Sequence, residues 1–119
     1  MEHFHQVQDD LRAPYRELSG AIPAVIAGFN ALHTAARSEG VLAMKTKELI
    51  ALAISITREC DGCIAAHARG AARRGATVEE VSEMIGVAIS MNGGPGTVWG
   101  PRALAAFHEF SSEAPAPPE

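Results

Sequence analysis

The sequence has few aromatic residues: Phe, Trp and Tyr make up only 5% of its 119 positions. Because large rings are scarce, the core must be built from Ala, Val, Ile, Leu and Met, within a hydrophobic content of 47%. Positive charge is scarce too, with 10 Lys and Arg against 14 Asp and Glu and a net charge of −4. An excess of negative charge gives no attraction to nucleic acid or to an anionic membrane, so we expect neither partner.

Long hydrophobic runs are also lacking. No apolar stretch is long enough to span a bilayer, and the opening "MEHFHQVQDD" is polar and acidic rather than a secretory signal. We therefore expect a soluble cytoplasmic protein. The length predicts one domain, and the composition is typical of a globular chain. A chain of this size leaves apolar surface uncovered, which favours a homo-oligomer.

Helical spacing is present along most of the chain. Between residues 22 and 40 the apolar residues fall on one stripe that ends at a glycine suited to a helix C-terminus: Ile22, Val25, Ile26, Phe29 and Leu32, then Gly40. The stretch "KTKELIALAISITREC" predicts a longer, central, buried helix, in which only the β-branched run "AISIT" could compete as a strand.

Start and stop signals divide the remainder into further helices. Thr77 and Glu80 form a capping box, and "NGGPG" breaks the chain after the helix that they open. The stretch "TVWGPRALAAFHEF" predicts a last helix with Pro101 in its first turn. The sequence thus predicts an all-α, single-domain helical bundle over residues 21–110, with an N-terminal segment 1–20 and a disordered tail 111–119.

The only two cysteines lie close together, in "TRECDGCIAAHARG". In a helical turn Cys60 and Cys63 share a face, and their Cα separation falls within the roughly 4.4–6.8 Å that a disulfide tolerates. A helix that begins near Asp61 would stabilise a thiolate, whereas the charges of Glu59 and Asp61 oppose it. In the cytoplasm such a pair is more often redox-active, catalytic or metal-binding than a structural staple.

His67 distinguishes the two sulfurs. It is one helical turn from Cys63 and two turns, roughly 10 Å, from Cys60. A base within hydrogen-bond reach acts directly on the thiol proton, so we predict Cys63 as the attacking thiol and Cys60 as the resolving one. Glu48, near the start of the preceding helix, is the carboxylate expected to orient His67 if the two helices form a hairpin.

Less reactive interpretations of the cysteine pair stay open. A zinc ion held by Cys60, Cys63 and His67 would have three protein ligands, whereas structural zinc usually takes four and no second CxxC exists. Two packed, inert cysteines are the other alternative. A thioredoxin-like site would need βαβ segments, and we find none. We expect neither a resident metal nor a cofactor.

The combination of Glu48, "CDGC" at 60–63 and His67 resembles the core motif of the alkylhydroperoxidase D-like proteins of the carboxymuconolactone decarboxylase superfamily. The likeness covers about residues 20–110 and implies an all-helical fold assembled into trimers or hexamers. It also implies a peroxidase reaction in which Cys63 becomes a sulfenic acid and Cys60 then forms the disulfide. The substrate would be a small hydroperoxide, and the reductant a dithiol donor such as a dihydrolipoyl or thioredoxin-like protein.

One position departs from the family pattern. Characterised members carry a histidine next to the second cysteine, where this chain has Gly62. A proton path must then run through Glu48 and His67 alone. A lactone decarboxylase, which does not rely on a CxxC pair, is the alternative activity, and a non-catalytic helical assembly module is the non-enzymatic one.

Six polar or aromatic residues outside the motif have simple interpretations. We assign His3 and His5 to a solvated tail and His108 and Glu109 to the polar face of the last helix. Trp99 is interpreted as a core or interface aromatic, with a substrate pocket as the alternative. His33 is interpreted as a polar residue at a helix-face boundary, with the active-site wall as the alternative.

Overall fold

The computed structural model describes residues 2–113. Within that range the chain forms helices and no strand: α1 (His3–Ala21), α2 (Pro23–Ala36), α3 (Met44–Thr57), α4 (Asp61–Arg73), α5 (Val78–Asn92) and α6 (Gly96–Ser111). The all-α prediction is confirmed, and the "AISIT" run lies inside α3. Most of the tail that we expected to be disordered, residues 114–119, lies outside the described residues.

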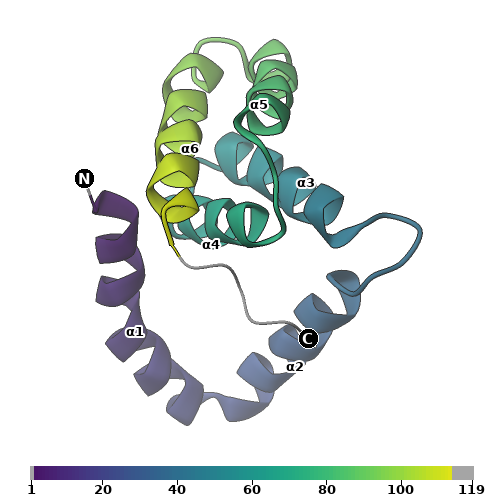
Figure 1. The fold of residues 1–119 in the computed structure, drawn as a ribbon. Helices are drawn as coiled ribbons and strands as arrows, with labels where there is room; N and C mark the ends of the chain where they lie inside the picture. Colours follow the sequence, from purple (N-terminus) through teal and green to yellow (C-terminus); the bar gives the residue numbers. More distant parts are fainter. Residues whose placement is uncertain (1, 114–119) are drawn as a thin grey trace.

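Helices α3 to α6 form the body of the molecule. Helix α1 starts against α4 and α6, and it continues into α2 to form an open arm (Figure 1). The core is mainly aliphatic, as the composition requires, and its buried rings are Phe107 and Phe110 of α6 and Phe4 of α1. Helix α4 contributes Ala65, Ala68 and Ala71, all fully buried at a spacing of three residues. Small side chains on that face let α3 and α6 approach the α4 backbone closely.

Helices α5 and α6 approach each other closely through two glycines. A Cβ at Gly96 would lie 2.9 Å from the Cα of Ile89, and one at Gly100 would lie 2.7 Å from Cγ2 of Ile85. Helix α6 begins at Gly96, just before the predicted stretch, and Pro101 lies inside the helix rather than in its first turn. The capping box of Thr77 and Glu80 at the start of α5 is confirmed.

The apolar stripe of α2 is helical, as predicted, but none of its residues is buried. Val25, Phe29 and Leu32 are 64%, 56% and 68% exposed. The helix ends at Ala36 rather than near Gly40. It ends there because the ammonium group of Lys47 donates to the carbonyl oxygens of Ala36 (2.9 Å) and Ser38 (2.6 Å), which stabilises an early helix end.

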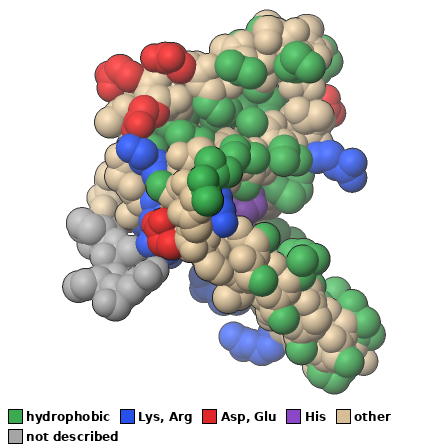
Figure 2. Space-filling model, turned by 90° about the vertical axis from the view of Figure 1, so that its right-hand side faces the viewer, with side chains coloured by type: hydrophobic (Ala, Val, Ile, Leu, Met, Phe, Trp, Pro, Cys, Tyr) green, Lys and Arg blue, Asp and Glu red, His purple; other side chains and the backbone are tan. Residues whose placement is uncertain are grey.

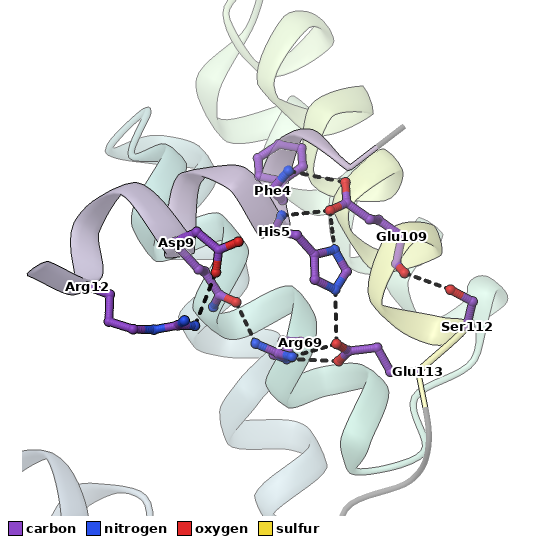
Figure 3. A network of polar contacts seen from close by, with 9 residues as sticks. Phe4, His5, Asp9, Arg12, Arg69, Glu109, Ser112 and Glu113 are labelled. Atoms are coloured by element: carbon purple, nitrogen blue, oxygen red, sulfur yellow. Dashed lines mark hydrogen bonds and ion pairs between the residues drawn. The ribbon is translucent and has the colours of Figure 1, made fainter.

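The N-terminal segment is a helix docked on the body, so the interpretation of His3 and His5 as a solvated tail is wrong. Figure 3 shows that Glu109 accepts from the amides of Phe4 (3.2 Å) and His5 (2.7 Å), which caps the start of α1. The His5 ring lies between Glu109 (Nδ1–Oε2, 2.5 Å) and Glu113 (Nε2–Oε2, 2.9 Å). Glu109 is thus a cap for α1 rather than an ordinary polar side chain of α6.

No single helix within residues 2–113 is long and apolar enough to cross a membrane. Helices α1 and α2 meet that length and composition only when they are counted together, and they are bent by 114° where they join.

Candidate functional site

The two cysteines stand at the N-terminus of α4 and are joined by a disulfide bond, with their Cα atoms 5.2 Å apart. Cys60 is the N-cap residue, and its sulfur accepts a hydrogen bond from the amide of Cys63 at 3.2 Å. Cys63 lies in the first turn of the helix and is exposed, whereas Cys60 is half-buried. The sulfur of Cys63 is therefore the one that a molecule in solution can approach.

Glu48 and His67 meet across the α3–α4 hairpin. The Oε1 atom of Glu48 lies 3.0 Å from Nδ1 of His67, and the glutamate is only 1% exposed. The second carboxylate oxygen accepts a hydrogen bond from the Arg37 guanidinium, which comes from the end of α2. The carboxylate thus lies between two nitrogen donors, one on each side.

Glu48 is ionised despite its burial. Burial alone would raise its pKa, but the hydrogen bond from His67 and the positive charge of Arg37 outweigh that effect and lower the pKa below its ordinary value. An ionised carboxylate can only accept, so Nδ1 of His67 carries the proton and donates it to Glu48. In the neutral form of the ring, the other nitrogen, Nε2, then has the free lone pair and can act as a base.

Gly70 makes room for this carboxylate. A Cβ built at Gly70 would lie 1.6 Å from Oε2 of Glu48, closer than any side chain can tolerate. Gly70 lies three residues after His67, so both face α3 from the same side of α4. Sequence reasoning missed this residue, although a glycine inside a helix, one turn from a functional histidine, is a usable signal.

Arg37 and His33 are further site residues, and the role of Arg37 was not predicted. The guanidinium donates from Nη1 to Nε2 of His33 at 2.8 Å. Burial and the neighbouring Arg37 charge both lower the pKa of His33, so its ring accepts as a neutral imidazole. The His33 ring also stacks on Phe29, with centroids 5.6 Å apart, and lies 6.1 Å from the His67 ring. The i, i+4 spacing of His33 and Arg37 was the signal available.

These residues surround a cavity of about 420 Å³ between α2, α3 and the start of α4. Its polar lining includes Cys63, His67, His33 and Arg37, and its apolar wall is formed by Ala36, Ile50, Ala51 and Ile54. Figure 2 shows a histidine in the hollow between the body and the helical arm, with hydrophobic side chains around it. Cys63 and His67 therefore face one shared space, and His33 belongs to its wall, whereas Trp99 packs against the core instead.

One predicted contact is absent in this oxidised form. Among residues 2–113, no hydrogen bond joins His67 to either sulfur, and Nε2 of His67 has no hydrogen-bond partner. The His67 ring is hydrogen-bonded to Glu48 through Nδ1, and the Cys63 sulfur is bonded to the sulfur of Cys60. The same described range contains no cluster of three or more His, Cys, Asp or Glu residues that could hold a metal.

A comparison with protein families places the chain. The family model described as the carboxymuconolactone decarboxylase family matches residues 23–109, most of the chain. The chain belongs to this family. The matched range contains all of Glu48, Cys60, Cys63 and His67, together with Arg37.

Three proteins illustrate the similarity, each over most of the length of this chain. A crystal structure of the apo form of a family protein from Legionella pneumophila has a TM-score of 0.91 and 37% identity, covering 94% of this chain and all of that one. An uncharacterized protein from Cupriavidus necator is 36% identical over 103 residues, 87% of this chain and 91% of its own length. An uncharacterized protein of the cox locus of Paracoccus denitrificans is 38% identical over 94 residues, 79% and 85% of the two chains.

Gly62, the position that departs from the alkylhydroperoxidase D-like pattern, faces α1. A Cβ at Gly62 would lie 3.2 Å from Cδ1 of Leu11, tighter than an ordinary van der Waals contact. A side chain at this position would therefore begin in contact with Leu11 of α1.

Proposed function

We propose that the protein is a thiol-dependent peroxidase that reduces hydroperoxides through a dithiol–disulfide cycle of Cys60 and Cys63. The observation that supports this most directly is the cavity that Cys63 and His67 line together, with the Glu48 carboxylate behind the imidazole. Cys63 would be the nucleophile, His67 the base and Glu48 the group that orients the base, which are the three roles that acid–base-assisted thiol chemistry requires.

In the first step the Cys63 thiol gives its proton to Nε2 of His67, and the thiolate attacks the outer oxygen of the hydroperoxide. The oxygen–oxygen bond breaks, and the alkoxide that leaves takes the proton back from His67 as an alcohol. Cys63 becomes a sulfenic acid, so the sulfur is oxidised by two electrons and the hydroperoxide is reduced by two. Glu48 holds the ring in the tautomer with the proton on Nδ1 and stabilises the imidazolium while it exists.

In the second step the Cys60 thiol attacks the sulfenic sulfur of Cys63. The sulfur–sulfur bond forms and water leaves, which gives the disulfide present in this structure. A dithiol donor then restores both thiols by exchange and is itself converted to a disulfide. Exchange begins at an accessible sulfur, which Cys63 supplies, and we place the cycle in the cytoplasm, where thiol reductants are maintained.

The donor proposed here is a dihydrolipoyl or thioredoxin-like protein, and the protein itself is proposed to work as a homo-trimer or homo-hexamer. The assembly is supported by α2, whose apolar stripe no described residue covers. A helix of 14 residues with no buried side chain gains little from its own chain, because short helices depend on packing for stability. A second copy of the same chain would provide that packing.

Mapping the product of one turnover tests the peroxidase proposal. The reduced protein is treated with one equivalent of cumene hydroperoxide, and the modified cysteines are identified by mass spectrometry. We expect the Cys60–Cys63 disulfide in the wild type, a trapped sulfenic acid on Cys63 in Cys60→Ser, and no peroxide consumption by Cys63→Ser. Full peroxidase activity in Cys63→Ser would show that another group performs the reaction.

One observation favours a second reaction, the lactone decarboxylation for which the family is named. The cavity is lined by the positively charged residues Arg37, Lys47 and Arg58, which suit the carboxylate of a lactone acid. That reaction needs no thiol. Turnover of a lactone acid that survives alkylation of both cysteines would favour the decarboxylase over the peroxidase.

A further inference from the structure

We propose that the hydroperoxide reduced at Cys63 carries a carboxylate on an apolar body, and that the Arg58 guanidinium binds this carboxylate in the cavity. The inference rests on the proposed peroxidase function and adds the class of its substrate. It starts from the charges that line the cavity. The chain as a whole has a net charge of −4, yet the cavity is lined by Arg37, Lys47 and Arg58 and by no acidic side chain of the described residues.

Two of these three cations are engaged with the protein. Arg37 donates to Glu48 and His33, so its charge is balanced by the buried carboxylate. Lys47 donates to the backbone carbonyls of Ala36 and Ser38 at the end of α2. The Arg58 side chain is exposed and has no hydrogen bond or ion pair with any residue in the described range. Arg58 is thus the cation of the cavity whose donors are available to a ligand.

Arg58 lies close enough in the chain to Cys63 for one ligand to reach both residues. Arg58 follows the last residue of α3, and Cys63 lies five residues later, in the first turn of α4. Both side chains line the cavity. A ligand whose carboxylate pairs with Arg58 can therefore extend into the space that Cys63 and His67 face.

The wall between these groups is apolar. Ile50 and Ile54 lie one turn apart on α3, line the cavity and are 46% and 57% exposed. Exposed branched side chains in a recess favour an apolar ligand that covers them. A cavity of about 420 Å³ suits a small organic molecule rather than a protein side chain alone. One ligand can contact all of these groups: its apolar body would cover Ile50 and Ile54, its carboxylate would pair with Arg58, and its peroxide would face Cys63.

A carboxylate is the anion that best matches this arrangement. The planar guanidinium presents two parallel donors to the two oxygens of a carboxylate, and such charge-assisted pairs are stronger than neutral hydrogen bonds. The other possible role for Arg58 is electrostatic, because a cation near Cys63 favours the thiolate for any substrate. The two roles differ in one measurable respect: only carboxylate binding discriminates between an anionic and a neutral peroxide.

A matched pair of peroxides separates the two roles. Cumene hydroperoxide and its para-carboxylate have the same reacting group and differ in one charge. The rate at which each oxidises the pre-reduced protein is measured by stopped flow, without any reductant, and the readout is the ratio of the two rates. We expect the wild type to prefer the carboxylate by about tenfold, the effect of one charge-assisted hydrogen bond.

Arg58→Gln should abolish this preference, and Arg58→Lys, which keeps the charge, should retain part of it. Arg73→Gln is the matched control, because it removes one exposed charge from α4 at a residue that does not line the cavity, and it should keep the wild-type ratio. Raising the salt concentration should lower the ratio in the wild type and leave it unchanged in Arg58→Gln.

Three outcomes would overturn the inference: no preference in the wild type, a preference that persists in Arg58→Gln, or an equal fall of both rates in that variant. The last outcome would assign Arg58 to thiolate stabilisation. Failure of the peroxidase function itself would look different, because neither peroxide would then oxidise Cys63 in the wild type.

Discussion

Glu48 and His67 are 19 residues apart in the sequence, and their side chains meet with Oε1 of the glutamate 3.0 Å from Nδ1 of the histidine. The carboxylate is almost completely buried, whereas the imidazole reaches the cavity. The buried carboxylate therefore orients an imidazole that lies in the cavity that Cys63 also lines. Its geometry makes Nε2 of His67 the atom available for proton transfer.

Removing the base should slow thiol oxidation. We expect His67→Ala to reduce the rate of Cys63 oxidation by hydroperoxide roughly a hundredfold, the usual contribution of a positioned general base. The pH at which Cys63 reacts with iodoacetamide should also move upward, because the thiol loses its proton acceptor. His108→Ala is a suitable control, since that histidine is exposed on α6 and does not line the cavity. An alkylation profile identical to that of the wild type would remove His67 from the mechanism.

The fit between Gly70 and Glu48 predicts a steric conflict. Gly70→Ala places a methyl group against the carboxylate, and we expect a loss of about 1–3 kcal/mol in the free energy of unfolding, measured in urea. Gly86→Ala is the matched control, because a Cβ there has nothing within 4 Å, and it should instead stabilise the helix by up to about 1 kcal/mol.

A double-mutant cycle identifies the source of that conflict. In a Glu48→Ala background the carboxylate is gone, so adding Gly70→Ala should cost little or be stabilising. An equal loss of stability in both backgrounds would mean that the alanine clashes with something other than Glu48.

Docking of α1 should depend on pH through His5. The hydrogen bonds to Glu113 and Glu109 raise the pKa of His5 above its ordinary value of 6.5. Because the folded pKa is the higher one, the His5 contribution is complete below pH 6.5 and is lost as the pH rises through the folded pKa. The pKa of Glu113 is lowered, chiefly by the hydrogen bond from Arg69, so its own contribution is lost at acid pH instead.

Unfolding of the wild type and of His5→Gln in urea checks this dependence. The difference in their free energies of unfolding should be largest near pH 6 and should shrink toward about pH 9, where the wild-type imidazole is neutral. His3→Gln is the control, because its ion-pair partner on α4, Asp61, is 3.7 Å away and both side chains are well exposed. A difference for His5→Gln that stays constant across this range would contradict the proposed ionised contact.

The uncovered stripe of α2 predicts self-association. Val25→Glu together with Leu32→Glu places two charges on the stripe without touching the cavity residues, and the molar mass measured by light scattering should fall toward that of one chain. Val87→Glu adds a charge to a similarly exposed position on α5 and should leave the mass unchanged. A wild-type mass equal to that of one chain would refute the assembly.

Local signals explain which parts of the fold could be predicted. The Thr77–Glu80 capping box depends on residues a few positions apart and was predicted correctly, and α4 begins at Asp61, the start on which the thiolate argument was conditional. The first-turn position of Pro101 was wrong, because α6 already begins at Gly96, where the helix is in close contact with α5. His5 and Glu109 were misread because 104 residues separate the two partners.

The amino-acid sequence by itself determined the helices from residue 22 onward, the single CxxC turn and the one-turn spacing of Cys63 and His67, because these follow from the helical repeat and from nearest neighbours along the chain. Only the tertiary structure decided that Arg37 faces Glu48, that Gly70 leaves space for the carboxylate, and that Arg58 lines the same cavity as Cys63. These relationships arise where α2, α3 and α4 pack together. Packing is set by the shapes of whole helix faces, which spacing along the sequence does not contain.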